Sequence, residues 1–239
     1  MKKQHSIGFG AVLLLAAVYF FVFQAVRFNL AATAAAEPAQ RPVVVVDAGH
    51  GGEDGGATTD EGVLESTINL SIALRLEQVL ALCGVQPEMI RTTDTAVYTE
   101  GNSIAEKKTS DLKNRVKLVN AVPGAILVSI HQNHFSEGRY HGAQVFYAAA
   151  PGSDTLAEGV QTALRTALDP DNNRQIKPGS AIYLLEEITC PGVLVECGFL
   201  SNANEAALLQ EGTYQTKLAC AITGAVLHYL ESEAEHLEV

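Results

Sequence analysis

Hydrophobic residues recur along this chain in two alternating patterns. Short apolar runs are typical of strands buried on both faces of a sheet, whereas apolar residues repeated every three to four positions indicate helices. The predicted strands are 43–46, 85–91, 125–130, 143–149, 182–185 and 193–195, and the predicted helices are 64–80, 112–122, 156–168 and 214–229. This alternation predicts an α/β fold, a three-layer, mostly parallel twisted sheet flanked by helices on both faces.

Three of the predicted strands lead directly to side chains that can take part in chemistry. The first strand is followed by a glycine-rich loop that contains His50. Strand 125–130 runs into His131, and strand 193–195 runs into Glu196. The carboxyl ends of parallel strands meet at one edge of a sheet, where α/β proteins bind their ligands. We therefore expect the two imidazoles and the carboxylate to lie close together.

A fourth candidate, Glu65, stands in the first turn of the helix that follows the glycine-rich loop. Two histidines and one glutamate, with a position left for water, form the ligand set of a hydrolytic zinc site. His50, Glu65 and His131 are therefore candidate ligands of Zn²⁺, provided that the first and third strands are neighbours. Glu196 is the candidate catalytic residue, because hydrolysis of an amide needs a group that moves a proton to the leaving nitrogen.

Each of these residues also has a purely structural interpretation. A glutamate at the start of a helix is favoured by the helix dipole, so Glu65 could serve stability alone. His131 could be a histidine satisfied within the core. Glu196 is harder to explain in this way, because burying an unpaired carboxylate costs several kcal/mol. The combination favours a site over four unrelated residues.

Other polar residues near these positions have weaker claims. His134 and His141 are expected in an exposed loop, as bystanders or as residues of a substrate groove. Asp47 is a candidate partner that orients an imidazole, as metal-bound histidines usually require. Glu53 and Asp54 are expected to be solvated.

Several other kinds of site do not fit the sequence. Ser66, Ser129 and Cys197 show no nucleophile elbow or paired base. The glycine-rich loop lacks the Gly-Lys-Ser/Thr of a phosphate-binding loop, and its acids would repel phosphate. The net charge of −11 excludes nucleic acid as an expected partner. The four cysteines form no C-x-x-C pair, and we expect buried free thiols.

The beginning of the chain has a different character from the rest. Two lysines precede an apolar run over 7–23, and a stretch of small residues ends at Ala36, so that 1–36 is predicted to be a signal peptide or an N-terminal membrane anchor. Residues 37–42 are predicted as a linker, 43–231 as one catalytic domain and 232–239 as an acidic tail. This organisation predicts an exported, extracytoplasmic domain.

Several motifs carry a family resemblance. They are VDAGHGG at 46–52, GGA at 55–57, SIHQN at 129–133 and VECGFLSN at 195–202, together with Glu65 and Glu205. These motifs resemble those of the zinc-dependent N-acetylmuramoyl-L-alanine amidases of the third amidase type. DLKNRVKLVN at 111–120 and IYL at 182–184 are most similar to the germination-specific, CwlD-type amidases of spore formers.

The resemblance implies a function and a substrate. It implies that His50, Glu65 and His131 bind Zn²⁺, that Glu196 is catalytic, and that the amide between N-acetylmuramic acid and L-alanine in peptidoglycan is hydrolysed. Glycan strands and stem peptides would be the partners, the wall or spore cortex the location, and muramic δ-lactam the eventual product. A lipoprotein activator is also implied.

Two alternatives remain compatible with the same fold. One is a catalytically silent domain that binds the wall or scaffolds a partner. A binding domain has no need of Glu196, which argues against this alternative. The other is a zinc peptidase that cuts elsewhere in the stem peptide, and its products would be amino acids or shortened peptides.

Overall fold

A computed structural model describes residues 42–237 of the chain, with side chains described as far as residue 234. The predicted signal peptide or anchor at 1–36 lies outside the described residues, as do most of the predicted linker 37–42 and the end of the predicted tail 232–239. No helix of the described part combines the length and the apolar character that a membrane span needs.

A six-stranded mixed sheet forms the centre of the described domain, with the strand order β2-β1-β3-β6-β4-β5. The strands are β1 (Val43–Ala48), β2 (Glu88–Met89), β3 (Ala125–Asn133), β4 (Gln144–Tyr147), β5 (Lys177–Pro178) and β6 (Gly192–Phe199). The first four strands in this order are joined by parallel pairing, and β4 runs antiparallel to β6. The predicted α/β fold with a mostly parallel sheet is confirmed.

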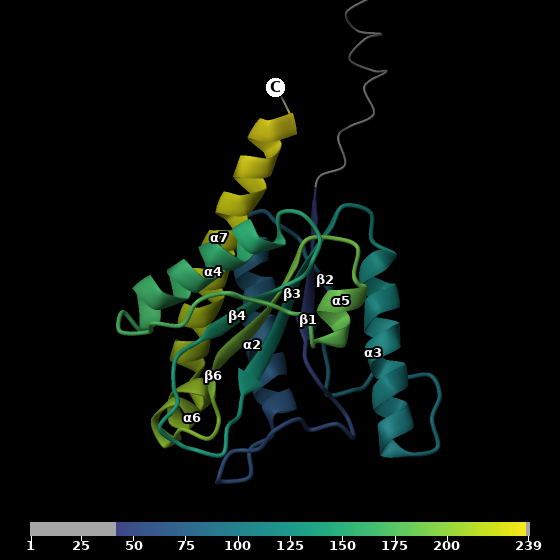
Figure 1. Cartoon of the computed structure of the whole chain (residues 1–239), viewed down its shortest axis with the longest axis vertical. Helices are drawn as coiled ribbons and strands as arrows, with labels where there is room; N and C mark the ends of the chain where they lie inside the picture. Colours follow the sequence, from purple (N-terminus) through teal and green to yellow (C-terminus); the bar gives the residue numbers. More distant parts are fainter. Residues whose placement is uncertain (1–41, 238–239) are drawn as a thin grey trace, which may run out of the picture. The chain divides into compact units, whose positions relative to one another are not determined.

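Helices cover both faces of the sheet, which gives the three predicted layers. The helices are α2 (Glu65–Leu82), α3 (Ile104–Asn120), α4 (Ser153–Leu168), α5 (Tyr183–Glu187), α6 (Ala203–Gln210) and α7 (Gly212–Leu237). Helices α2, α4 and α7 contribute to one hydrophobic core, and α3 and α5 contribute to a second core on the opposite face. In Figure 1, α4 and α7 lie to the left of the strands and α3 lies to the right.

The alternation of side chains along the strands determines which residues face the site. In β3, Ile126, Val128 and Ile130 enter the core under α2, whereas Ala125 and Leu127 enter the core under α3 and α5. Since successive residues of a strand point to opposite faces, His131 lies on the α3 and α5 side. Glu196 follows Leu194 on that same side, because Leu194 belongs to the second core.

Two strand predictions are corrected by the structure. Residues 182–185 were expected to form a strand, but Tyr183–Glu187 is helix α5, with adjacent Leu184 and Leu185 both buried. A short apolar run fits a buried strand and a buried helical turn equally well. The strand expected over 85–91 is reduced to Glu88–Met89.

The remaining differences concern helix ends and an additional helix. Helix α3 begins at Ile104 because Ser103 and Glu106 form a capping box, which the charged composition of that segment concealed. Helix α6 was not predicted, and α7 continues to Leu237 rather than ending near residue 229. All four cysteines are free thiols, but Cys197 alone is buried.

Candidate metal centre

The loop after β1 brings His50 into position by means of a strained backbone. His50 has φ +60°, and it is the one non-glycine residue of the described chain with a positive φ. A Cβ at Gly49 would come within 2.2 Å of the His131 ring, and a Cβ at Gly56 would come within 2.5 Å of Glu65 Oε2. Both positions therefore require glycine, because the two imidazoles and the carboxylate occupy that space.

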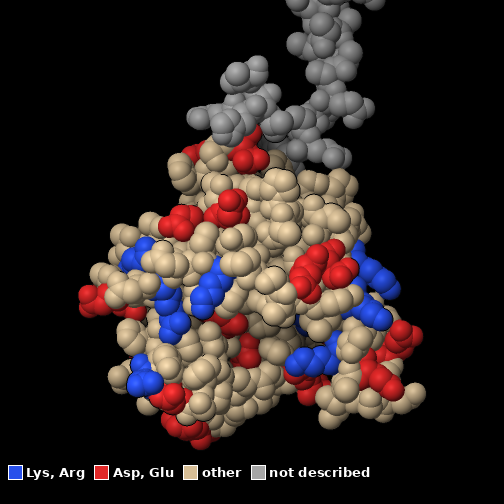
Figure 2. Space-filling view, in the orientation of Figure 1, with Lys and Arg blue, Asp and Glu red and all other residues tan. Residues whose placement is uncertain are grey.

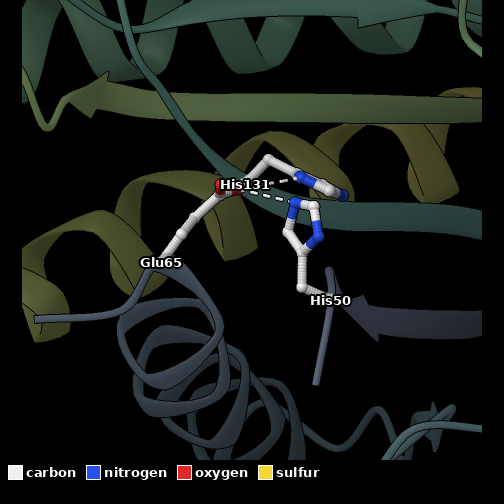
Figure 3. A group of neighbouring side chains, drawn as sticks. All are labelled: His50, Glu65 and His131. Carbon is white, nitrogen blue, oxygen red and sulfur yellow. Dashed lines mark hydrogen bonds and ion pairs between the residues drawn. The ribbon is translucent and has the colours of Figure 1, made fainter. Parts of the chain in front are cut away.

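The structure brings His50, Glu65 and His131 together. Glu65 Oε1 lies 3.3 Å from His50 Nε2 and 3.1 Å from His131 Nδ1, and both rings approach this carboxylate in Figure 3. One potential ligand atom from each residue lies within 4.8 Å of the other two. Two imidazole nitrogens and one carboxylate oxygen form a donor set that suits a divalent transition metal. The cluster can therefore hold a metal ion.

His50 is oriented by Asp54, a residue expected to be solvated. Asp54 Oδ2 lies 2.9 Å from His50 Nδ1, and Lys108 Nζ lies 3.3 Å from the same oxygen. When Nδ1 donates to Asp54, the lone pair of Nε2 is directed toward the cluster, as metal-binding histidines require. Burial lowers the pKa of His50, but hydrogen bonds with Asp54 and Glu65 raise the pKa to about 9, so a metal that binds Nε2 would displace a proton from the ring. Asp54 was expected to be solvated, and it is partly exposed but also holds His50.

Glu65 is held as a charged carboxylate by several donors. Its Oε2 accepts a hydrogen bond from the Ala57 N–H at 2.9 Å, and its Oε1 accepts from the Gln132 N–H at 3.1 Å and from Asn69 Nδ2 at 3.3 Å. Burial raises the pKa of Glu65, but the hydrogen bonds and charges of His131 and His50 together hold the pKa well below its usual range. An ionised, immobilised carboxylate is the form in which glutamate binds a metal.

Glu196 lies beside this cluster. It is the direct neighbour of His131 in the pairing of β3 with β6. Its Oε2 is buried and has no hydrogen-bond partner among the described residues. Burial raises the pKa of Glu196 to about 7, with the charge of Glu65 contributing in the same direction against the opposing effect of His131. A carboxyl group with such a pKa can both accept and release a proton at neutral pH.

Asp47 does not orient an imidazole, so that expectation was wrong. It forms a buried ion pair with Arg115 and accepts a hydrogen bond from Ser129 Oγ at 2.7 Å. Burial raises the pKa of Asp47, but the charge of Arg115 lowers it to a net value below that of a free aspartate. Ser129 is thereby used in the support of the site and is not placed as a nucleophile.

Two buried arginines hold the backbone that precedes and includes His50. Neither was a candidate site residue from the sequence. Arg115 donates to Ala48 O at 3.0 Å and to His50 O at 2.7 Å, while Arg91 donates to Ala48 O at 2.7 Å and to Gly49 O at 3.0 Å. The i, i+4 pair of Asp111 and Arg115 is the one sequence signal for this arrangement.

The remaining candidates lie apart from the cluster or serve other contacts. His134 and His141 are exposed, as expected, and His141 Nδ1 lies 3.5 Å from Asp169. Glu53 pairs with Lys107 at 2.8 Å. Cys197 is buried in the core under α2, on the face opposite to Glu196, where burial raises its pKa to a value at which the thiol is neutral.

Known proteins of one family are similar to this chain over most of its described residues. A family model described as N-acetylmuramoyl-L-alanine amidase matches residues 44–228. The germination-specific N-acetylmuramoyl-L-alanine amidase of Bacillus subtilis is 36% identical over 200 residues, which cover 83% of this chain and 84% of that protein.

Two solved structures share the fold. The CwlD amidase of Clostridioides difficile, in complex with the GerS lipoprotein, superimposes with a TM-score of 0.77 at 38% identity and covers 80% of this chain and 99% of its own. An N-acetylmuramoyl-L-alanine amidase from Clostridium difficile 630 gives a TM-score of 0.71 at 31% identity, with 81% of this chain and 99% of that chain covered.

Proposed function

Because this chain belongs to the N-acetylmuramoyl-L-alanine amidase family, hydrolases that act on peptidoglycan, we propose that it works with a zinc ion held by His50, Glu65 and His131 and with Glu196 as the catalytic residue. The observation that carries this proposal is the convergence of the three ligand atoms, all within 4.8 Å of one another, beside a buried and unpartnered carboxylate oxygen.

The residues present fit a zinc ion. The donor set is that of catalytic zinc sites with three protein ligands, and hydrogen bonds from outside the cluster fix His50 and Glu65. A bound zinc ion would activate water and polarise the scissile carbonyl. His50 would offer Nε2, because its Nδ1 faces Asp54 at 2.9 Å.

Glu196 would transfer the proton that amide hydrolysis requires. Its free Oε2 would accept a proton from the attacking water and deliver it to the nitrogen of L-alanine as the amide bond breaks. A pKa of about 7 allows both halves of this transfer near neutral pH. The bond hydrolysed would be the amide between N-acetylmuramic acid and L-alanine.

We further propose a role in the spore cortex, in the maturation that leads to muramic δ-lactam. The similarity to a germination-specific amidase supports this setting. The enzyme would be exported and would face the wall or cortex, either released or anchored by residues 1–36. Because the similar CwlD amidase was solved with the GerS lipoprotein, we propose a lipoprotein partner for this chain as well.

The roles of the metal ligands and of Glu196 are separated by two substitutions. Glu196→Gln should retain one zinc ion per chain and lose at least about 100-fold in activity on peptidoglycan, since it removes proton transfer alone. His131→Ala should lose both zinc and activity. Elemental analysis and an assay of released peptides measure the two quantities, and full activity of Glu196→Gln would contradict the assigned role.

The products distinguish this proposal from its alternatives. Mass spectrometry of digested peptidoglycan should find whole stem peptides that begin with L-alanine. Free amino acids or shortened stems would indicate a zinc peptidase instead. Binding to the wall without any release, by a protein loaded with zinc, would indicate a catalytically silent domain.

A further inference from the structure

The surface next to Glu196 carries a guanidinium group that is fixed in place and has no acidic partner. Arg174, in the loop between α4 and β5, donates from Nε to His141 O at 2.8 Å and from Nη1 to Gln144 Oε1 at 3.4 Å. Its Cζ lies 4.5 Å from the centroid of the Phe199 ring. These contacts hold the side chain on a rigid support rather than leaving it extended into solvent.

The residues that contact the Arg174 side chain place it near Glu196, the proposed catalytic residue. Gln144 is the direct partner of Glu196 in the antiparallel pairing of β4 with β6. Side chains of directly opposed residues lie on the same face of a sheet and close together. Arg174 therefore reaches a side chain adjacent to Glu196, and Phe199 belongs to the same strand as Glu196. The face of the molecule shown in Figure 2 has a hollow with acidic side chains at its floor and basic side chains on both sides.

The charge of Arg174 is not neutralised by the described residues. Arg115 pairs with Asp47 and Asp111, and Arg139 pairs with Glu137 at 2.9 Å, but no described carboxylate lies within 4.0 Å of Arg174. Arg174 Nη2 makes no hydrogen bond to any described residue, so this end of the guanidinium remains available.

Arg174 also borders a cavity. Arg174 lines an open cavity of about 360 Å³ together with Tyr140, His141, Asn172 and others. Asp171 also borders the cavity but forms no ion pair with Arg174. A preorganised guanidinium beside a cavity is the arrangement that proteins use for a carboxylate, which can accept two parallel hydrogen bonds from it.

We propose that Arg174 binds a free carboxylate of the peptidoglycan stem peptide and thereby selects stems that carry this charge. The proposal rests on the proposed function, because the substrate of that reaction places an acidic residue next to the L-alanine at the scissile bond. When this residue is glutamate joined through its side-chain carboxyl, its α-carboxylate is free. Arg174 is then a specificity-determining residue and takes no part in bond cleavage.

Two synthetic substrates test the proposal directly. They are muramoyl peptides that differ only in this α-carboxylate, which is free in one and converted to a carboxamide in the other. For the wild-type enzyme loaded with zinc, we expect a KM about tenfold lower for the carboxylate, as is typical of a charge-assisted hydrogen bond. Arg174→Gln should abolish this difference by raising the KM of the carboxylate substrate alone.

Two further variants serve as controls. Arg139→Gln should keep the preference, because Arg139 borders the same cavity but is paired with Glu137. Arg174→Lys should restore part of the preference, since lysine keeps the charge but not the fork of donors. Equal KM values for the two substrates in the wild type, or equal losses on both substrates in Arg174→Gln, would overturn the proposal.

Binding measurements separate this proposal from the proposed reaction. Calorimetry with the free stem peptide, as acid and as carboxamide, measures recognition without turnover. Tighter binding of the acid by the wild type, lost in Arg174→Gln, supports the proposal whether or not bonds are cleaved. Equal binding of both peptides would refute it. A failure of the proposed function would instead appear as a lack of peptide release from either substrate by the wild type.

Discussion

Gly56 shows how closely the candidate metal centre depends on single residues. Its φ of +70° is one that few other residues adopt, and the place where a Cβ would stand is 2.5 Å from Glu65 Oε2 and 2.7 Å from His50 Cδ2. The glycine therefore leaves room for two of the three proposed ligands. The candidate metal centre therefore needs glycine at this position for its lack of a side chain as well as for its backbone conformation.

Gly56→Ala should therefore weaken zinc binding by about 10- to 100-fold, as is usual when groups that support metal ligands are disturbed. Gly62→Ala provides the matched control, because Gly62 has φ +87° but its Cβ would meet nothing within 4 Å. Both variants should lose about 1–3 kcal/mol of stability from backbone strain. Competition with a zinc chelator measures the affinity, and equal affinities in the two variants would contradict the account.

Asp47 gives the domain a predictable dependence on pH. The pKa of Asp47 in the folded state lies below the unfolded value of about 3.8 because of the charge of Arg115. The stabilisation from this lowered pKa is therefore present above about pH 4 and is lost as the pH falls through the folded pKa.

In Asp47→Asn, the free energy of unfolding should be lower at neutral pH and should change less between about pH 5 and pH 2 than in the wild type. Glu65 also contributes to the acid dependence, but it is present in both proteins, so the difference between the curves reports Asp47. Urea denaturation at each pH measures the effect. Parallel curves would argue against the ion pair as the source of the dependence.

At the scale of elements, the turn after β6 fixes the loop that borders the site. Glu205 accepts hydrogen bonds from the Gly142 N–H at 2.9 Å and from the Phe199 N–H at 2.8 Å. Asn202 Nδ2 donates to Gly138 O at 2.8 Å, and Ser201 Oγ accepts from the Phe135 N–H at 3.1 Å. The loop between β3 and β4 is thus attached to the start of α6.

Glu205→Gln should loosen this attachment, because a carboxamide offers one acceptor oxygen where the carboxylate offers two. We expect faster amide hydrogen exchange over 134–142, with β3 unchanged. Glu211→Gln is the control, since Glu211 is an exposed carboxylate after α6. Exchange that stays at the wild-type rate in Glu205→Gln would show that the other contacts suffice.

The sequence predicted elements well where burial alone determined the pattern. The valines of β1 and the run that forms β3 are buried on both faces, so their continuous hydrophobicity identified them. Residues 182–185 were misassigned because two adjacent buried leucines do not distinguish a helical turn from a strand. The capping box at Ser103 does not stand out in the sequence because the helix that it begins is mostly charged.

The residues of the candidate site were predictable from the sequence for a physical reason, but their supporting contacts were not. His50 follows β1, while His131 and Glu196 lie near the carboxyl ends of β3 and β6, and topology brings these strand ends together. The supporting contacts depend on tertiary structure that no local pattern contains. Arg91 reaches Ala48 O across 43 positions of sequence, and Asp54 meets His50 through the conformation of an irregular loop.

At the scale of the whole molecule, the strand order explains why the site exists. Strands β1, β3 and β6 are adjacent in the sheet, although α2, β2 and α3 separate the first two in sequence and β4, α4, β5 and α5 separate the last two. Their carboxyl ends therefore carry His50, His131 and Glu196 to one edge. Helix α2 adds Glu65 from its first turn.

A metal held by groups from separate elements should stabilise the folded domain as a whole. An ion that binds only the folded state adds about 4 kcal/mol when its concentration exceeds the Kd by a factor of about 1,000. We expect EDTA to lower the Tm of the wild type and to leave the Tm of His131→Ala unchanged. Equal shifts in both proteins would indicate that the stabilising ion binds elsewhere.

The position of the metal itself is the most direct test of the account. Crystals of the zinc-loaded protein should give one strong anomalous difference peak at the zinc absorption edge, about 2.0–2.2 Å from a nitrogen of His50, a nitrogen of His131 and an oxygen of Glu65. Glu196 should face this peak without binding it. A peak at other residues, or none at this cluster in fully loaded crystals, would contradict the account.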